Sequence, residues 1–217
     1  NNQKEYVGVA DFEGLAGSGQ LLTVPVDTRS SSSVVEIANT LSRSVKVNIV
    51  VYSSTGKALK KLTVYLAAYR SYLLGVDSVL GAQKLGMVTI KSNTTASIVS
   101  AMINYTRNSD NTLAYMYAVS GQEASGTVIS GSYNTYLGQE DQLLVLNPTG
   151  YSRNIALSLT RFDGTAVYNN SKITTTPAYG TSAININALT TSNSYGIAKV
   201  QTNTSNVLVS WILRKKG

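Results

Sequence analysis

The chain has few of the residue types that carry enzyme chemistry. Its 217 residues include no His and no Cys, so the commonest general base and the thiolate nucleophile or metal ligand are both missing. A Ser-x-x-Lys spacing at Ser54 and Lys57 matches some acyl-transfer enzymes, but that chemistry needs the Ser at the start of a helix. Here the spacing follows an alternating apolar run and contains Gly56, which predicts the tip of a hairpin.

Paired carboxylates are the other chemistry to consider, because glycoside cleavage needs two of them flanking one bond. The close pairs among the 11 acidic residues are Asp11 with Glu13 and Glu140 with Asp141. Neighbouring residues of a strand point to opposite faces, so Glu140 and Asp141 cannot converge there. We predict solvated carboxylates for both pairs, and a chain that is not an enzyme, with no catalytic residue, metal site or cofactor.

Two stretches of the chain repeat each other and organise the rest. Residues 35–56 contain an apolar run ending in Asn39, a polar corner, an alternating run and a turn with Gly, and residues 145–164 repeat this order around Asn147. The two Asn residues stand at the same distance before their Gly, so the copies align without a gap. We predict a structural role for both side chains, bonding to the backbone of the corner.

Further matches extend the repeat at an offset of about 108 to 110 residues, a scale that indicates repeated domains. Two predicted opening strands, at residues 6–12 and 21–26, have counterparts at residues 113–119 and 127–133. The matches near the end of each copy are Gly86 with Gly196, Asn93–Thr94 with Asn203–Thr204, and Ser100 with Ser210.

The strand pattern predicts an all-β fold. Each copy has seven or eight short apolar runs with turn signals every 8–12 residues, as in an immunoglobulin-like sandwich. In the run at residues 45–52, Val and Ile share one face, and Ile155, Leu157 and Leu159 repeat that face. Polar or small residues alternate with them, as a strand with one buried face requires.

We therefore predict two tandem immunoglobulin-like β-sandwich domains related by internal duplication. The first copy spans residues 1–106, a polar linker spans 107–112, and the second copy spans 113–217. In its short strands, its Asn-, Ser- and Thr-rich composition and its tandem arrangement, the chain resembles repeated immunoglobulin-like modules of bacterial surface, adhesin and filament proteins.

Composition and charge favour an exported protein. Only 13% of the residues are charged, and 14 Tyr stand against 2 Phe, which is common in secreted and cell-surface β-proteins. The net charge of +7 comes from mostly scattered Lys and Arg, with little of the aromatic interleaving that single-stranded nucleic-acid binding uses. No apolar run approaches the roughly 18 residues of a membrane helix. We predict an extracellular or cell-surface location, with no nucleic-acid partner and no membrane-spanning segment.

Two surfaces are candidates for contact with partners. Tyr residues suit recognition surfaces because they offer large contact area at low entropic cost, although the same residues could simply line strands. The last predicted strand is apolar on both faces, which requires either a cover from the same chain or another subunit. The candidate binding residues are Tyr65, Tyr69, Tyr72, Tyr115, Tyr117, Tyr133 and Tyr136, and the candidate assembly residues are Val207, Val209, Trp211 and Leu213.

These features predict a non-enzymatic structural or adhesive protein of a cell surface, filament or appendage. It would act by self-association or by contacts with other surface proteins, through strand edges and the apolar last strand. The alternative is a carbohydrate-binding or adhesion module that uses the Tyr clusters to hold a glycan.

Overall fold

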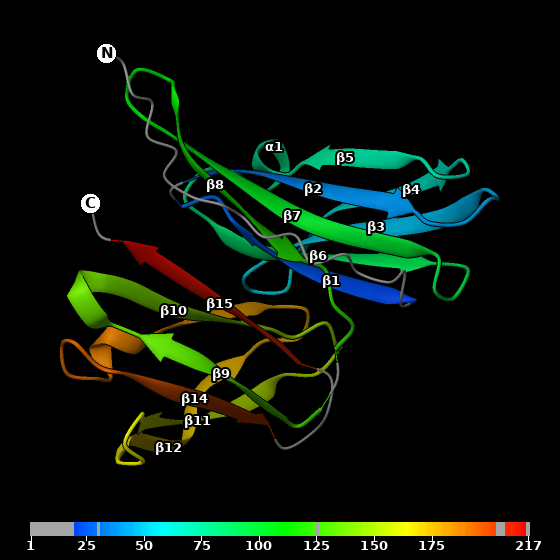
Figure 1. Ribbon diagram of the computed structural model, residues 1–217. Helices are drawn as coiled ribbons and strands as arrows, with labels where there is room; N and C mark the ends of the chain where they lie inside the picture. Colours follow the sequence, from blue (N-terminus) through cyan, green and yellow to red (C-terminus); the bar gives the residue numbers. More distant parts are fainter. Residues whose placement is uncertain (1–19, 30, 125, 203–206, 216–217) are drawn as a thin grey trace. The chain divides into compact units, whose positions relative to one another are not determined.

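The computed structural model describes residues 20–29, 31–124, 126–202 and 207–215 (Figure 1). The strand expected at residues 6–12 lies outside these ranges. The all-β prediction is confirmed, since the described elements are strands apart from one short helix and two single 3-10 turns. The chain divides into two compact units, residues 1–53 with 58–123 (unit 1) and residues 54–57 with 124–217 (unit 2). In the described part, no helix has the length and apolar character needed to cross a bilayer.

Unit 1 contains two four-stranded antiparallel sheets that share one core. One sheet has the order β1-β6-β3-β4 and the other the order β5-β2-β7-β8. Alternating apolar residues of both sheets, such as Val47 and Ile49 of β3 and Ile37 of β2, are buried in one cluster. The elements are β1 (Leu21–Asp27), β2 (Ser32–Asn39), β3 (Val45–Ser53), β4 (Ala58–Leu66), β5 (Ser71–Gly75), α1 (Asp77–Leu80), β6 (Leu85–Ser92), β7 (Ile98–Arg107) and β8 (Leu113–Ser120).

Unit 2 contains a four-stranded antiparallel sheet, β12-β11-β14-β9, and a three-stranded one, β13-β10-β15. Ile155, Leu157 and Leu159 of β11 are buried in its core, as their alternation predicts. The elements are β9 (Val128–Asn134), η1 (Tyr136–Gly138), β10 (Gln139–Leu146), β11 (Arg153–Arg161), β12 (Ala166–Thr176), β13 (Thr181–Asn185), η2 (Ile186–Ala188), β14 (Tyr195–Thr202) and β15 (Leu208–Lys215).

The two units have the same strand order. Each strand from β1 to β7 has its counterpart in the strand numbered eight higher, so β1-β6-β3-β4 corresponds to β9-β14-β11-β12, and β5-β2-β7 to β13-β10-β15. The predicted match of Gly86 with Gly196 lies within this correspondence. A Cβ on Gly86 would lie 2.3 Å from the Tyr52 carbonyl oxygen, and one on Gly196 would lie 2.0 Å from that of Thr160, so only glycine fits either position without a shift.

This strand order differs from the expected immunoglobulin-like one. In an immunoglobulin sandwich the first strand lies beside the second and the last beside the sixth. Here β1 pairs with β6, and β2 pairs with β7. Strand number and turn spacing fit many sandwich topologies, so the sequence pattern alone could not distinguish them.

The division between the units lies beyond the expected linker. Of residues 107–112, Arg107 ends β7 and the other five form the turn to β8, which pairs with β7 inside unit 1. In this turn the Asp110 carboxylate accepts hydrogen bonds from the Thr112 N–H and hydroxyl, and Asn111 has a positive φ of 66°. A tight polar turn and an interdomain linker have the same composition, so the prediction of a linker here is wrong.

One predicted match at the end of the copies is displaced by a residue. Ser100 of β7 lies opposite Ile37 of β2, and the corresponding residue of β10, Val145, lies opposite Val209. The counterpart of Ser100 is therefore Val209 and not Ser210.

Candidate functional site

The predicted Tyr residues do not form one surface. Tyr65, Tyr69 and Tyr136 are exposed by 72%, 70% and 47%, but Tyr133 is only 1% exposed. Tyr133 belongs to the core of unit 2, where its hydroxyl lies 3.0 Å from that of Ser194, so its assignment to a binding surface is wrong. Strand residues that face inward and outward cannot be told apart when both are Tyr, since the ring suits either side.

Two further Tyr residues support the core of unit 1. Tyr72 and Tyr117 are half-buried and pack against its apolar cluster. The side chain of Tyr115 lies outside the described set. Tyr65 and Tyr69 thus remain as exposed candidates in unit 1, and Tyr136 in unit 2.

The exposed position of Tyr69 belongs to a corner that both units share. Tyr69 has a φ of 56° and its N–H donates to the Leu41 carbonyl, while Tyr179 has a φ of 53° and its N–H donates to the Thr149 carbonyl. Positive φ is uncommon for a residue with a large side chain. The shared backbone conformation therefore gives Tyr69 a role in the fold.

Buried Asn side chains hold this corner in both units. The Asn39 side-chain amide donates to the carbonyls of Arg43, Leu66 and Ala67 at 2.8, 3.1 and 2.9 Å, and its Oδ1 accepts from the Leu41 N–H. The prediction that this side chain bonds to the backbone of the corner is confirmed.

Asn147 makes the same contacts in unit 2. Its amide donates to the carbonyls of Tyr151, Thr176 and Pro177 at 2.7, 3.4 and 2.8 Å, and its Oδ1 accepts from the Thr149 N–H. Neither residue points at a ligand site, because both side chains are buried.

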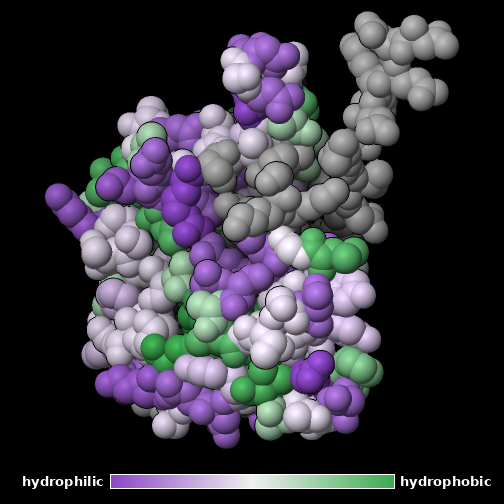
Figure 2. Space-filling model, turned by 90° about the vertical axis from the view of Figure 1, so that its left-hand side faces the viewer, coloured by the Kyte–Doolittle hydropathy of each residue, from purple (hydrophilic) through white to green (hydrophobic). Residues whose placement is uncertain are grey.

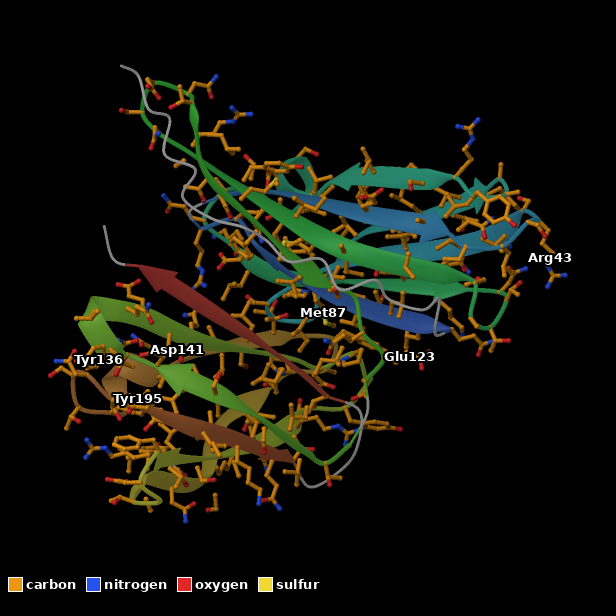
Figure 3. The ribbon with its side chains drawn as sticks, in the orientation of Figure 1. Arg43, Met87, Glu123, Tyr136, Asp141 and Tyr195 are labelled. Atoms are coloured by element: carbon orange, nitrogen blue, oxygen red, sulfur yellow. The ribbon has the colours of Figure 1, made fainter. Side chains whose placement is uncertain are left out.

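An aromatic cluster that the sequence did not reveal lies at one end of unit 2. Phe162 and Tyr195 stack with ring centroids 4.6 Å apart and an interplanar angle of 8°. Tyr195 also lines an open depression of about 430 Å³ together with Asn134 and Tyr136. Figure 3 shows Tyr136 and Tyr195 at the same end of the unit. We call Tyr136, Phe162 and Tyr195 the aromatic cluster.

Strand pairing brings these three residues together. Tyr195 lies opposite Asn134 across β14 and β9, and the Phe162 N–H donates to the Tyr195 carbonyl at 3.1 Å. The Asn134 side chain accepts from the Tyr136 N–H at 2.8 Å, which holds the turn that carries this ring. The residues are far apart in the chain, so no local pattern could have found the cluster.

The aromatic cluster is not required by the fold. By strand correspondence, the equivalent residues of unit 1 are Arg29, Ser54 and Leu85, none of them aromatic. All three rings are exposed, between 43% for Tyr195 and 64% for Phe162. On the face drawn in Figure 2, exposed apolar residues form separate patches among polar ones. An exposed aromatic stack beside a depression is a suitable platform for a flat, partly apolar ligand such as a sugar ring.

A buried carboxyl lies beside the depression. Asp141 is 3% exposed, and its Oδ2 accepts from the Asn134 N–H at 2.7 Å. Its Oδ1 is buried without a hydrogen-bond partner among the described residues. Burial raises the pKa of the Asp141 carboxyl to about 6, and the bond from Asn134 opposes that rise.

The expectation that Asp141 is a solvated acid is therefore wrong. Asp141 lies on β10 facing inward, while its neighbour Glu140 is exposed. In the described ranges, no group of three acidic residues is placed to hold a metal ion.

The predicted assembly face of the last strand turns inward. Val207 and Val209 belong to the core of unit 2, while the side chains of Trp211 and Leu213 lie outside the described set. Among the described residues of the last strand, both faces are apolar: Leu208, on the face opposite Val209, is also buried. Leu144 and Leu146 of the neighbouring β10 are buried as well. None of these three belongs to the core cluster.

The edge of the last strand differs between the units. In unit 1, β7 lies between β2 and β8. In unit 2, β15 pairs with β10 alone within the described residues. One unit thus has an eighth strand where the other has a sheet edge.

No protein-family model and no curated protein sequence matches the chain. Among solved structures it is similar to Thermotoga maritima 1070, at 14% identity and a TM-score of 0.41, over 48% of this chain and 94% of that one. A protein of Parabacteroides distasonis that is predicted to be secreted matches at 8% identity and a TM-score of 0.27, over 96% of this chain and 86% of that one. Infectious bursal disease virus, Gx strain, matches at 12% identity and a TM-score of 0.21, over 91% and 57%. All three TM-scores lie below 0.5.

Proposed function

We propose that the chain is an exported, non-enzymatic structural or adhesive protein made of a duplicated β-sandwich unit, and that it acts through contacts at its sheet edges. The common strand order and the matching Asn39 and Asn147 anchors support the duplication. A second anchor does so independently: the Thr28 hydroxyl donates to the Gly81 carbonyl and the Thr135 hydroxyl to that of Thr191, two corresponding positions.

The observation that carries the proposal is the edge of β15, which pairs with β10 alone in the part of the chain that the structure describes. An exposed edge presents unpaired N–H and C=O groups that favour pairing with another strand. In unit 1 the equivalent edge is covered by β8, so this sheet position accommodates an added strand. Val207, Leu208 and Val209 are already buried within the chain, which moves the proposed contact from the faces of the last strand to its edge.

Self-association of the purified chain tests this function. We expect sedimentation velocity to show species larger than the 23.1 kDa monomer, increasing with concentration, and electron micrographs to show strings or rings. Strand addition depends on concentration when the strand comes from another chain. A chain that stays monomeric up to millimolar concentration, with no assemblies on micrographs, contradicts the proposal.

A second candidate function is glycan binding at the aromatic cluster. It is favoured by exposed rings that have no aromatic counterpart in unit 1. On a glycan array we expect binding that weakens roughly tenfold in Tyr136→Ala and in Tyr195→Ala. Tyr65→Ala, which removes a still more exposed ring from unit 1, should leave the binding unchanged. An array without any bound glycan removes this candidate.

A further inference from the structure

The way β8 completes unit 1 is a template for the β15 edge. β8 runs antiparallel to β7, from Ala101 opposite Ser120 to Arg107 opposite Leu113. Tyr117 and Val119 of β8 pack against the core of unit 1, so the strand contributes side chains as well as backbone pairing. The strand that fills the equivalent place in unit 2 should supply both.

The chain contains a second segment in the sequence position of β8. Val88 and Ala198 correspond, because each stands two residues after the matched Gly86 and Gly196. Val24 lies opposite Val88 and Gly131 lies opposite Ala198, so the first strands of the two units correspond at a spacing of 107 residues. Continued backwards without a gap, this spacing aligns residues 6–14 with residues 113–121. Gly14 then matches Gly121, and Ser18–Gly19 matches Ser125–Gly126.

The match at Gly14 is physically specific. Gly121 ends the β8 segment, and its N–H donates to the Ser100 carbonyl at 2.7 Å. A Cβ on Gly121 would lie 1.9 Å from the Ser100 Oγ and 3.0 Å from a Val24 methyl carbon. The close approach of this segment to β7 favours a glycine, and residues 6–14 carry one at the same place.

Charge also complements the β15 edge. The segment holds Asp11 and Glu13, with Glu5 just before it, whereas the end of the chain holds Arg214, Lys215 and Lys216. Opposite charges favour encounter of the two strands and disfavour pairing of the segment with a copy of itself.

We propose that residues 6–14 of one chain pair with β15 of a second copy and form, in its unit 2, the strand that corresponds to β8 of unit 1. This inference rests on the proposed function and names its partner. Within the chain, the strands β1 to β7 of unit 1 are followed by β8 and then by unit 2, and the proposed contact repeats this order between two chains. A head-to-tail neighbour supplies residues 6–14 after unit 2 in the same order.

The template also sets the register. Val35 of β2 corresponds to Leu143 of β10. Met102 lies opposite the first and Trp211 opposite the second, so Trp211 is the counterpart of Met102 in strand register. In unit 1, Met102 lies opposite Val119 and Ile103 opposite Ala118. Transferred by these correspondences, the proposed pairs are Phe12 with Trp211 and Asp11 with Ile212.

Disulfide trapping tests this pairing in the full chain, which has no Cys of its own. Chains carrying Asp11→Cys and chains carrying Ile212→Cys are mixed under mild oxidation. We expect a covalent dimer in the mixture, and a ladder of higher multiples from chains that carry both substitutions. The matched control is Ile103→Cys with Ala118→Cys, the described pair at the same place in unit 1, which should close within one chain.

Two further variants test register and side-chain contact. Ala10→Cys mixed with Ile212→Cys should not link, because neighbouring residues of a strand point to opposite faces. Phe12→Asp, added to the Asp11→Cys chain, should lower the yield of mixed dimer at least tenfold. It replaces the counterpart of Val119 by a charge and leaves every described residue unchanged.

The outcomes separate the two proposals. If the doubly substituted chain loses its thiols but keeps the mass of a monomer, residues 6–14 pair within their own chain and the inference is overturned. If the control closes and no link forms between Asp11→Cys and Ile212→Cys, it is overturned as well. In either case, if assemblies are still seen in sedimentation, the proposed structural function remains and must use another contact. If no assemblies are seen, the proposed function and the proposed pairing are both contradicted.

Discussion

Asn147→Ala should lower the free energy of unfolding of unit 2 by about 3 kcal/mol, because several backbone groups of the corner lose their hydrogen-bond partner at once. The Asn147 amide donates to the carbonyls of Tyr151 and Pro177 at 2.7 and 2.8 Å, and its Oδ1 accepts from Thr149. The side chain is fully buried, so water cannot replace these bonds without opening the corner. Denaturant unfolding followed by the fluorescence of Trp211, the single Trp of the chain, measures the change on β15 of the same unit.

Two companion variants separate the hydrogen bonds from side-chain volume. Asn147→Asp keeps the acceptor for Thr149 but sets a carboxylate against three carbonyl oxygens, and we expect a loss at least as large as that of Ala at pH 7. Asn154→Ala, at an exposed Asn on β11, should cost less than about 1 kcal/mol. A loss below 1 kcal/mol in Asn147→Ala would show that the corner is held by other contacts.

The second large effect is a stability that depends on pH through Asp141. The pKa of this carboxyl is raised from 3.8 to about 6 in the folded chain, so between these values the folded state binds more protons than the unfolded state. Its contribution is therefore fully present below about pH 4 and is lost as the pH rises through 6. The shift corresponds to about 3 kcal/mol at most, at about 1.4 kcal/mol per pKa unit.

Asp141→Asn isolates this contribution. The unfolding free energy of the parent chain is subtracted from that of the variant, which cancels the pH dependence that the other carboxylates contribute to both chains. Asp110 and Asp163 are among these, since hydrogen bonds from Thr112 and Thr165 lower their pKa. We expect the difference to move in favour of the variant by about 2 kcal/mol between pH 4 and pH 7.5. Glu140→Gln, at the exposed neighbouring position, should give a flat difference. A flat profile for Asp141→Asn would mean that its carboxyl is ionised in a solvated site.

Much of the fold could be predicted from residue patterns because burial on one face imposes a period of two. The alternation around Val47 and Ile49 and its repeat around Ile155 and Leu157 identified the central strands and the faces that pack inward. The recurrence of Asn39 and Asn147 identified the corner, since few other side chains can both accept and donate to the backbone there.

What could not be predicted depended on pairing between distant strands. Residues 107–112 are polar because they turn tightly, and only the pairing of β7 with β8 distinguishes this turn from a linker. The residues of the aromatic cluster follow the ends of β9 and β11 and begin β14, and no local stretch of sequence predicts that these three strands are neighbours. Asp141 and Tyr133 are buried because they lie on the inward side of their strands. Asp usually prefers the surface and Tyr suits either side, so neither residue type predicted this burial.

The hairpin of β7 and β8 has a consequence for how copies of the chain can join. Because β8 is tethered to β7 by a short turn, closing this pair costs little entropy and the β7 edge stays occupied. On the proposed pairing, residues 6–14 are the donor segment and the β15 edge is the acceptor, so the two contacting surfaces are different. On the proposed pairing, contacts between copies are heterologous, so the product is a ring or an open string with direction. An open string has chemically distinct ends, one presenting a bare β15 and the other an unused residue 6–14 segment, and a cap for one end would leave growth at the other untouched.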